Sequence, residues 1–172
     1  MSYSAKVNQK NAVLSVQAEV ENTDKMPVTV KVLHEVFDRD GKKVGAGSRD
    51  YSLKADEMVK KELTICVAQP KLWSLENPYL YTIKTTLSKG GKVIDRTETQ
   101  AGIRSLTFDP NKGFALNGKL MKVKGVCIHH DAGCLGVAVP KEVWRRRLLQ
   151  LKEIGCNAVR MSHNPQATCV YE

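Results

Sequence analysis

Two short segments of the sequence gather side chains that could do chemistry. The run IHHD, residues 128–131, follows one apolar stretch, and the run RMSHNP, residues 160–165, ends another. Imidazoles can donate hydrogen bonds to sugar hydroxyls, and an arginine can hold a nearby carboxylate ionised. One histidine alone is more often structural, but three together with an arginine and an aspartate favour a functional site. The candidate residues are His129, His130, Asp131, Arg160 and His163.

Both runs stand at the ends of strands in an expected βαβ unit. Residues 121–127, MKVKGVC, are expected to form a buried strand, and residues 156–161, CNAVRM, a second one. A helix is expected to begin near Pro140 and to end at Gly155. The apolar stripe of this helix consists of Trp144, Leu148 and Leu151. Because strands of such a unit run parallel, and functional residues gather at their carboxyl ends, the two runs should meet at one edge.

The residues before Arg104 show the period of strands and no helical period. Apolar and polar residues alternate, and Asp40-Gly41 offers a hairpin turn that needs positive φ. The expected strands cover residues 12–21, 28–37, 59–67, 79–87 and 93–99. Residues 70–81 contain two prolines, so they are expected to form an ordered crossover that Trp73 anchors by packing. Short turns between strands predict a two-sheet sandwich of immunoglobulin type.

The charge and the hydropathy restrict the classes of partner. The formal net charge is +9, but the Lys and Arg residues are spread along strand-like stretches and one helix, so no nucleic-acid partner is expected. No apolar run approaches the roughly 20 residues of a membrane span, so no membrane partner is expected either. The first residues lack the basic start and apolar core of a secretory signal. The cellular compartment is left open.

The five cysteines are odd in number, irregularly spaced and without a CxxC pair, which argues against a disulfide framework or a structural zinc site. Cys66 and Cys156 lie in apolar strand-like runs, where burial as small hydrophobic residues is expected. Cys127 and Cys134 flank the histidine pair, so a metal site stays open as an alternative. No metal ligand set and no cofactor is identified in these residues.

Several of these motifs occur in the order and at the spacing found in one enzyme family. They are LNGK at residues 116–119, KGV at 124–126, HHD at 129–131 and NAVRMSH at 157–163, preceded by residues 72–81 and by AGIR at 101–104. The chain resembles a piece of a family 2 glycoside hydrolase of the β-galactosidase type. The resemblance implies an immunoglobulin-like sandwich over residues 1–104 and the first, incomplete part of a TIM-barrel catalytic domain over residues 105–172.

The resemblance also implies roles for individual residues. His129 and His163 match family histidines that contact the sugar and support the transition state, and Arg160 matches an arginine that pairs with the nucleophilic glutamate. Cys127 and Ile128 stand where an asparagine and an arginine are common, and Asn164 stands where many members have tyrosine, which leaves the substrate preference open. The ending ATCVYE no longer follows the family pattern. Binding of a divalent cation or Na⁺ stays open for a whole member, but no ligands for either are identified here.

The implied activity of the whole protein is retaining hydrolysis of terminal β-linked sugars in carbohydrate metabolism. That reaction needs two carboxyl groups about 5 Å apart, one as acid/base and one as nucleophile. At the strand ends only Asp131 carries a carboxyl group. The two catalytic glutamates of the family belong to later barrel strands, so they are expected to lie beyond Glu172, the last residue of this chain. The 172-residue chain is therefore expected to be inactive, with a carbohydrate substrate for the longer protein only.

Two other interpretations stay open. One is a non-catalytic sandwich module that binds carbohydrate or protein, which glycan-array binding by residues 2–104 would favour. The other is a basic nucleic-acid binder, which would show steep salt dependence in DNA binding.

An incomplete barrel should also leave apolar surface uncovered and promote self-association, because unpaired strand edges and apolar patches recruit a partner. The apolar residues expected to be uncovered are Val123, Val126, Trp144, Leu148, Leu151 and Val159.

Overall fold

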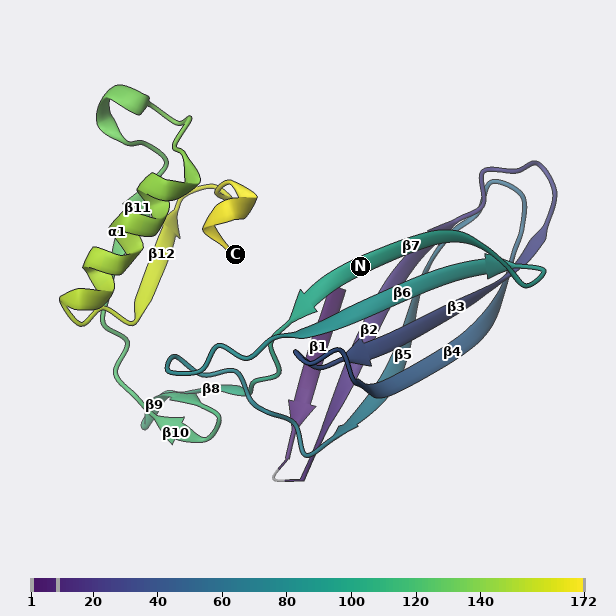
Figure 1. Cartoon of the computed structure of the whole chain (residues 1–172), viewed down its shortest axis with the longest axis horizontal. Helices are drawn as coiled ribbons and strands as arrows, with labels where there is room; N and C mark the ends of the chain where they lie inside the picture. Colours follow the sequence, from purple (N-terminus) through teal and green to yellow (C-terminus); the bar gives the residue numbers. More distant parts are fainter. Residues whose placement is uncertain (1, 9, 172) are drawn as a thin grey trace. The chain divides into compact units, whose positions relative to one another are not determined.

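The computed structural model describes residues 2–8 and 10–171 (Figure 1). The chain divides into two compact units, which are described separately. The sandwich unit comprises the residues up to Thr107 together with Ala115–Lys119. The barrel unit comprises Phe108–Phe114 and the residues from Leu120 onward. The domain boundary expected after Arg104 stays a prediction, because the segment from Phe108 to Lys119 is shared between the two units.

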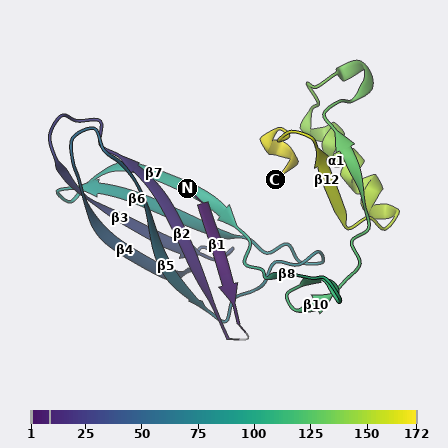
Figure 2. The ribbon, with the colours of Figure 1, turned by 180° about the vertical axis from the view of Figure 1, so that it is seen from behind.

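Seven antiparallel strands form the two sheets of the sandwich unit (Figure 2). One sheet has the order β1-β2-β5 and consists of Ser2–Val7, Asn11–Glu21 and Met58–Ala68. The other has the order β4-β3-β6-β7 and consists of Lys43–Leu53, Val28–Phe37, Tyr81–Lys89 and Lys92–Ala101. The chain passes from one sheet to the other between β2 and β3, between β4 and β5, and between β5 and β6. These crossings give the immunoglobulin-like sandwich that the sequence predicts.

The core of the sandwich lies between the inward faces of the two sheets. On β2 every second residue from Ala12 to Val20 is buried, as the alternation of the sequence predicts. Val36 and Ile83 from the opposite sheet belong to the same core. The expectation for Cys66 is wrong, because its neighbours Ile65 and Val67 take the inward positions of β5 and leave the thiol on the exposed face.

Strand β4 crosses close to β5, which explains its glycines. A Cβ atom on Gly45 would lie 2.8 Å from Cγ2 of Ile65, and one on Gly47 would lie 2.8 Å from Cδ2 of Leu63. Real side chains do not tolerate such distances, so the β5 side chains fill the space that β4 side chains would otherwise occupy. The glycines allow this close approach, but they leave β4 without the alternation of apolar and polar residues that marks the other strands in the sequence.

Trp73 anchors the crossover between β5 and β6, as the sequence predicts. Its backbone N–H donates to the Ile103 carbonyl at 2.8 Å, and its carbonyl accepts from Nδ2 of Asn117 at 2.9 Å. The Arg104 guanidinium lies 4.6 Å from the centre of the indole ring. A Cβ atom on Gly102 would meet the ring at 3.0 Å, so the tryptophan packs directly on the backbone. These contacts support packing as the role of Trp73.

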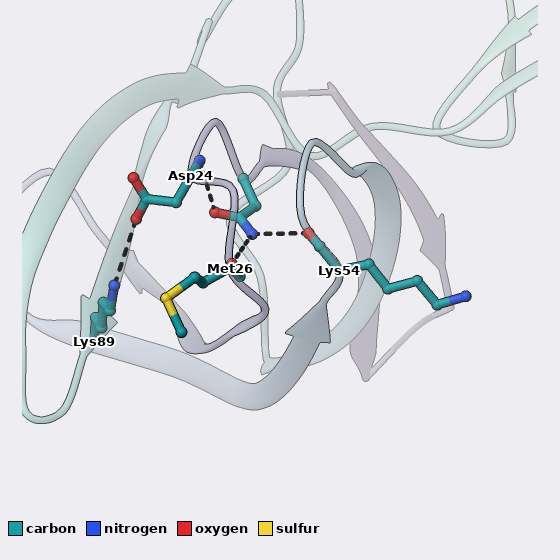
Figure 3. A network of polar contacts seen from close by, with 5 residues as sticks. Asp24, Met26, Lys54 and Lys89 are labelled. Carbon is teal, nitrogen blue, oxygen red and sulfur yellow. Dashed lines mark hydrogen bonds and ion pairs between the residues drawn. The ribbon is translucent and has the colours of Figure 1, made fainter.

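A buried asparagine ties together two loops at one end of the sandwich. Nδ2 of Asn22 donates to the carbonyls of Met26 and Lys54 at 2.9 and 2.7 Å, and Oδ1 accepts the Asp24 N–H at 3.2 Å. Figure 3 shows the two carbonyls converging on this amide, with the Asp24 and Lys89 ion pair at its side. The Asn22 side chain is only 5% exposed, so water cannot replace these partners fully.

Replacing Asn22 by Ala is expected to lower the free energy of unfolding by about 1–3 kcal/mol, because buried backbone groups lose their partners. Chemical denaturation measures the change. The matched control is Lys89→Ala, which removes only an ion pair of 3.7 Å between exposed side chains. Such a pair contributes about 0–1 kcal/mol, so equal losses in the two variants would contradict the structural role of Asn22.

His34 is a buried titratable group in the same sandwich. It is 2% exposed, and its Nδ1 lies 2.8 Å from Oγ1 of Thr85 on the neighbouring strand. Burial lowers the pKa of His34 below the ordinary value of 6.5, because the charged imidazolium loses its hydration. The folded protein therefore holds this imidazole neutral at neutral pH.

The stability of the sandwich is expected to fall as the pH drops below 6.5. In that range the unfolded chain protonates His34 more readily than the folded chain does, which favours unfolding by up to about 1.4 kcal/mol per pH unit. Denaturation midpoints at pH 7 and pH 5 measure the effect. The variant His34→Gln should lose less stability over this interval than the wild type, and an equal loss would show that other groups cause the acid sensitivity.

A small three-stranded sheet follows the sandwich strands. It has the order β10-β9-β8 and consists of Lys119–Leu120, Gly113–Leu116 and Leu106–Asp109. Asn117 and Gly118 connect β9 to β10 with φ angles of 51° and 76°. Two consecutive positive φ values are typical of the tight hairpin turn that the Asn-Gly pair predicts.

The barrel unit contains the predicted βαβ unit. Strand β11, Gly125–His129, is followed by the short 3₁₀ helix η1, Gly133–Leu135, and by helix α1, Lys141–Glu153. Strand β12, Ala158–Ser162, pairs parallel to β11, and the 3₁₀ helix η2, Thr168–Val170, follows it. Gly155 has a φ of 87° just after the helix, which confirms its expected role at the helix end. Among the described residues, no helix is long and apolar enough to span a membrane.

Two sequence expectations for this unit need correction. The first strand begins at Gly125, four residues later than expected, and most of it is exposed because β12 is its only paired strand among residues 2–8 and 10–171. Trp144, expected to be uncovered, is only 2% exposed because Val139 and Val170 cover it. Val123 is 58% exposed as expected. Self-association through such apolar residues stays a prediction.

Candidate functional site

The strand pair β11–β12 has two faces with different surroundings. Ile128 and Met161 point to the face that packs with Trp144 of α1. The residues directly before and after each of these two point to the opposite face, because side chains alternate along a strand. The register pairs Cys127 with Arg160 and His129 with Ser162. This second face, called the open face, carries Cys127 and His129 from β11 and Arg160 and Ser162 from β12.

The two histidines of the separate sequence runs meet at the carboxyl end of the strand pair. The ring centres of His129 and His163 are 5.5 Å apart, and the rings are inclined at 76°. Both side chains are exposed, so their ring nitrogens are accessible to a ligand. Two imidazoles at this separation can donate hydrogen bonds to neighbouring groups of one ligand. The structure thus brings together the residues that the sequence places 34 positions apart.

Arg160 lies on the open face one step before the histidines. Its Nη1 donates to Oγ of Ser162 at 2.7 Å and to Sγ of Cys127 at 3.8 Å. The hydrogen bond from Arg160, with a second from the Ser162 hydroxyl, holds the pKa of the Cys127 thiol below its ordinary value of 9.0. The guanidinium therefore supplies positive charge beside the histidine pair.

Asp131 and His130 are placed differently from the histidine pair. Nη1 of Arg147 on α1 donates to the backbone carbonyl of Asp131 at 2.9 Å, and this contact ties the loop after β11 to the helix. Among the residues that the structure describes, neither Asp131 nor His130 makes a side-chain hydrogen bond or ring contact with His129 or His163. Their direct part in the site stays a prediction.

The two catalytic glutamates are expected beyond Glu172, and this expectation is not tested by the described residues. Glu172 itself lies outside the described residues, which end at Tyr171. The segment just before it forms η2, whose Val170 packs on Trp144 of α1. The position of the catalytic glutamates in a longer protein therefore stays a prediction.

Two features of the open face were not predicted from the sequence. One is the presence of Ser162, and the other is the contact of Cys127 with Arg160. Ser162 is 2% exposed and directly faces His129 in the strand register. The alternation Arg160, Ser162 within one strand was the signal that could have placed both on one face. Over residues 2–8 and 10–171, no group of three or more His, Cys, Asp or Glu side chains is arranged to hold a metal ion.

The structure thus combines a β-sandwich with a βαβ unit that carries polar side chains at the carboxyl ends of its parallel strands, which is how a (β/α) barrel with its functional edge begins. Residues 1–104 match the family model Glycosyl hydrolases family 2, and residues 110–172 match the model of the TIM barrel domain of that family. The chain belongs to family 2 of the glycosyl hydrolases.

Curated relatives include members with two named specificities. The chain is 40% identical over 161 residues to a β-galactosidase of Bacteroides ovatus, in a match that covers 94% of this chain and 19% of that protein. It is 35% identical over 170 residues to a β-glucuronidase of Bacteroides fragilis, in a match that covers 98% of this chain and 22% of that protein. The chain thus spans about a fifth of the length of these relatives.

Solved structures show the same arrangement of elements. A glycosyl hydrolase family 2 member from Bacteroides cellulosilyticus matches with a TM-score of 0.91 at 36% identity, over 98% of this chain and 23% of that one. A β-glucuronidase of Bacteroides uniformis matches with a TM-score of 0.86 at 33% identity, over 98% of this chain and 20% of that one. The expected family, the mainly β fold and the class of glycoside hydrolase are therefore confirmed.

Proposed function

We propose that this chain is part of a retaining β-glycosidase and contributes sugar-binding and transition-state-stabilising residues to its active site. The observation that carries the proposal is the placement of His129 and His163 side by side at the carboxyl ends of β11 and β12. This edge is where barrel enzymes of this kind gather their catalytic groups. A terminal β-linked sugar is the proposed substrate, and the histidines donate hydrogen bonds to its hydroxyl groups.

Arg160 has a distinct part in this proposal. Its guanidinium lies on the open face, which corresponds to the interior of a complete barrel because α1 covers the opposite face. A positive charge there would keep a catalytic carboxylate ionised and correctly oriented. The strands β11, GVCIH, and β12, AVRMS, contain no carboxylate themselves. The carboxylate partner of Arg160 is therefore proposed to come from another barrel strand of a longer protein.

The proposed specificity includes two candidates. β-Galactosidase activity is supported by the relative from Bacteroides ovatus, and β-glucuronidase activity by the relatives from Bacteroides fragilis and Bacteroides uniformis. A galactoside is neutral, whereas a glucuronide carries a carboxylate that needs a cationic or hydrogen-bonding partner. His129 and His163 are proposed not to separate the two substrates, because both histidines can bind hydroxyl groups of either sugar.

The test compares nitrophenyl β-galactoside and nitrophenyl β-glucuronide as substrates of a longer protein in which these residues precede a complete barrel. The ratio of the two kcat/KM values assigns the specificity. Hydrolysis of either glycoside with retention of the anomeric configuration supports the proposal. Hydrolysis of neither, or inversion of the configuration, would overturn it.

The 172-residue chain by itself is proposed to be inactive. A retaining enzyme needs two carboxyl groups about 5 Å apart, one on each side of the glycosidic bond. Asp131 is the one acidic residue directly after β11, and residues 158–165 contain none. A single carboxyl group cannot serve as both nucleophile and acid/base. The chain on its own therefore offers binding groups without the pair that breaks the bond, and that pair is proposed to come from residues beyond Glu172.

A further inference from the structure

Three side chains on the open face form a cluster that sugar binding by the histidines does not explain. Arg160 and Ser162 come from β12, and Cys127 comes from β11, directly opposite Arg160 in the register. One guanidinium nitrogen of Arg160 contacts both others, Oγ of Ser162 at 2.7 Å and Sγ of Cys127 at 3.8 Å. The cluster thus crosses from one strand to the other and converges on a single donor group.

The geometry points to a positioning role: Cys127 and Ser162 hold the Arg160 guanidinium on the open face, beside His129. Ser162 is the fixed point, because its side chain is only 2% exposed in a regular strand. Arg160 is exposed, and a free arginine side chain samples many rotamers. Two acceptors on neighbouring strands restrict that sampling and direct the planar group.

The sulfur is the group in this cluster that can become anionic. Strands β11 and β12 contain no Asp or Glu, so a Cys127 thiolate is the one anion that their side chains can offer Arg160. The other titratable groups near the open face are His129, at the end of β11, and His163, just after β12. A protonated imidazole would favour the Cys127 thiolate in the same way as the Arg160 guanidinium does, because both carry positive charge.

What Arg160 is positioned to do, namely to pair with a carboxylate of a longer protein, rests on the proposed function. The cluster itself does not, and it can be tested on the 172-residue chain without any substrate. The reactive form of a cysteine is its thiolate. In alkylation by iodoacetamide the sulfur forms a bond to carbon, iodide leaves, and the thiol proton passes to the buffer. The pH dependence of this reaction therefore reports the charge partners of each cysteine.

The experiment measures alkylation rates of individual cysteines by peptide-resolved mass spectrometry between pH 5 and pH 10. Cys66 and Cys134 are exposed on other elements and serve as references in the same molecule. The alkylation midpoint of Cys127 is expected at lower pH than those of both references. Arg160→Gln and Ser162→Ala should each shift the Cys127 midpoint upward and leave the references unchanged. Ser162→Thr keeps the hydroxyl and should restore the low midpoint.

Two results would overturn the proposal. One is a Cys127 midpoint equal to those of the references, and the other is a low midpoint that Arg160→Gln leaves unchanged. If Ser162→Ala disturbs folding, which circular dichroism would reveal, Arg160→Gln decides the question because Arg160 is exposed. Failure of a longer protein to hydrolyse glycosides would refute the proposed function and leave this result intact. A failed alkylation test would refute the positioning role and leave the histidine site intact.

Discussion

Replacing Trp144 by Ala is expected to destabilise the barrel unit by about 3–5 kcal/mol, the usual cost of removing a large buried aromatic side chain. Trp144 is the largest fully buried side chain of that unit and packs with Val139 and Val170. A unit with one helix and two paired strands has few other contacts to compensate. Amide hydrogen exchange should show the loss as faster exchange throughout β11 and β12.

The matched control for this change is Leu149→Ala on the same helix. Leu149 is 43% exposed, so its truncation should cost less than about 1 kcal/mol and leave exchange in β11 and β12 nearly unchanged. Exchange in the sandwich strand β2 should be unaffected in both variants, because Trp144 belongs to the other compact unit. Equal exchange rates in wild type and Trp144→Ala would show that the tryptophan does not hold the barrel unit together.

Replacing His129 or His163 by Ala should lower kcat/KM of a longer, active protein by a factor that corresponds to about 2–4 kcal/mol. This is the scale observed when a preorganised hydrogen-bond donor to a transition state is removed. The centres of the two exposed rings are 5.5 Å apart, so each ring can reach a neighbouring hydroxyl of the same ligand. Steady-state kinetics on the better of the two nitrophenyl glycosides measures the change.

A suitable control variant is Cys66→Ser, on the exposed face of strand β5 in the sandwich unit. Its kcat/KM should equal that of the wild type. Losses that appear only as a higher KM would assign the histidines to ground-state binding, and unchanged kinetics would reassign both to a structural role. The double variant should lose less than the sum of the single losses if the two histidines act on one ligand.

The sandwich was predictable from its alternating strands but not in full. Half-buried strands such as β2 require an apolar residue at every second position, and this requirement is visible in the sequence. Strand β4 was not predicted, because Gly45 and Gly47 take positions where an apolar side chain would have marked the inward face. Strand β1 is short and lies at a sheet edge, so its pattern is correspondingly weak.

The site was predictable in its location but not in its internal contacts. The order strand, helix, strand was sufficient to bring His129 and His163 to one edge, because parallel strands end on the same side. The register between β11 and β12 depends on tertiary packing, so the contact between Cys127 and Arg160 could not be derived from spacing. The burial of Trp144 by Val170 was equally hidden, because the segment after Gln166 has no recognisable pattern.

The most direct test of the account is the release of nitrophenol from β-galactoside and β-glucuronide by two proteins at equal molar concentration. One is the 172-residue chain, and the other is a longer protein in which the same residues precede a complete barrel. We expect turnover by the longer protein and no rate above buffer for the chain, because the two catalytic glutamates are proposed to lie beyond Glu172. Turnover by the chain that Asp131→Asn abolishes, or no turnover by the longer protein on either glycoside, would contradict it.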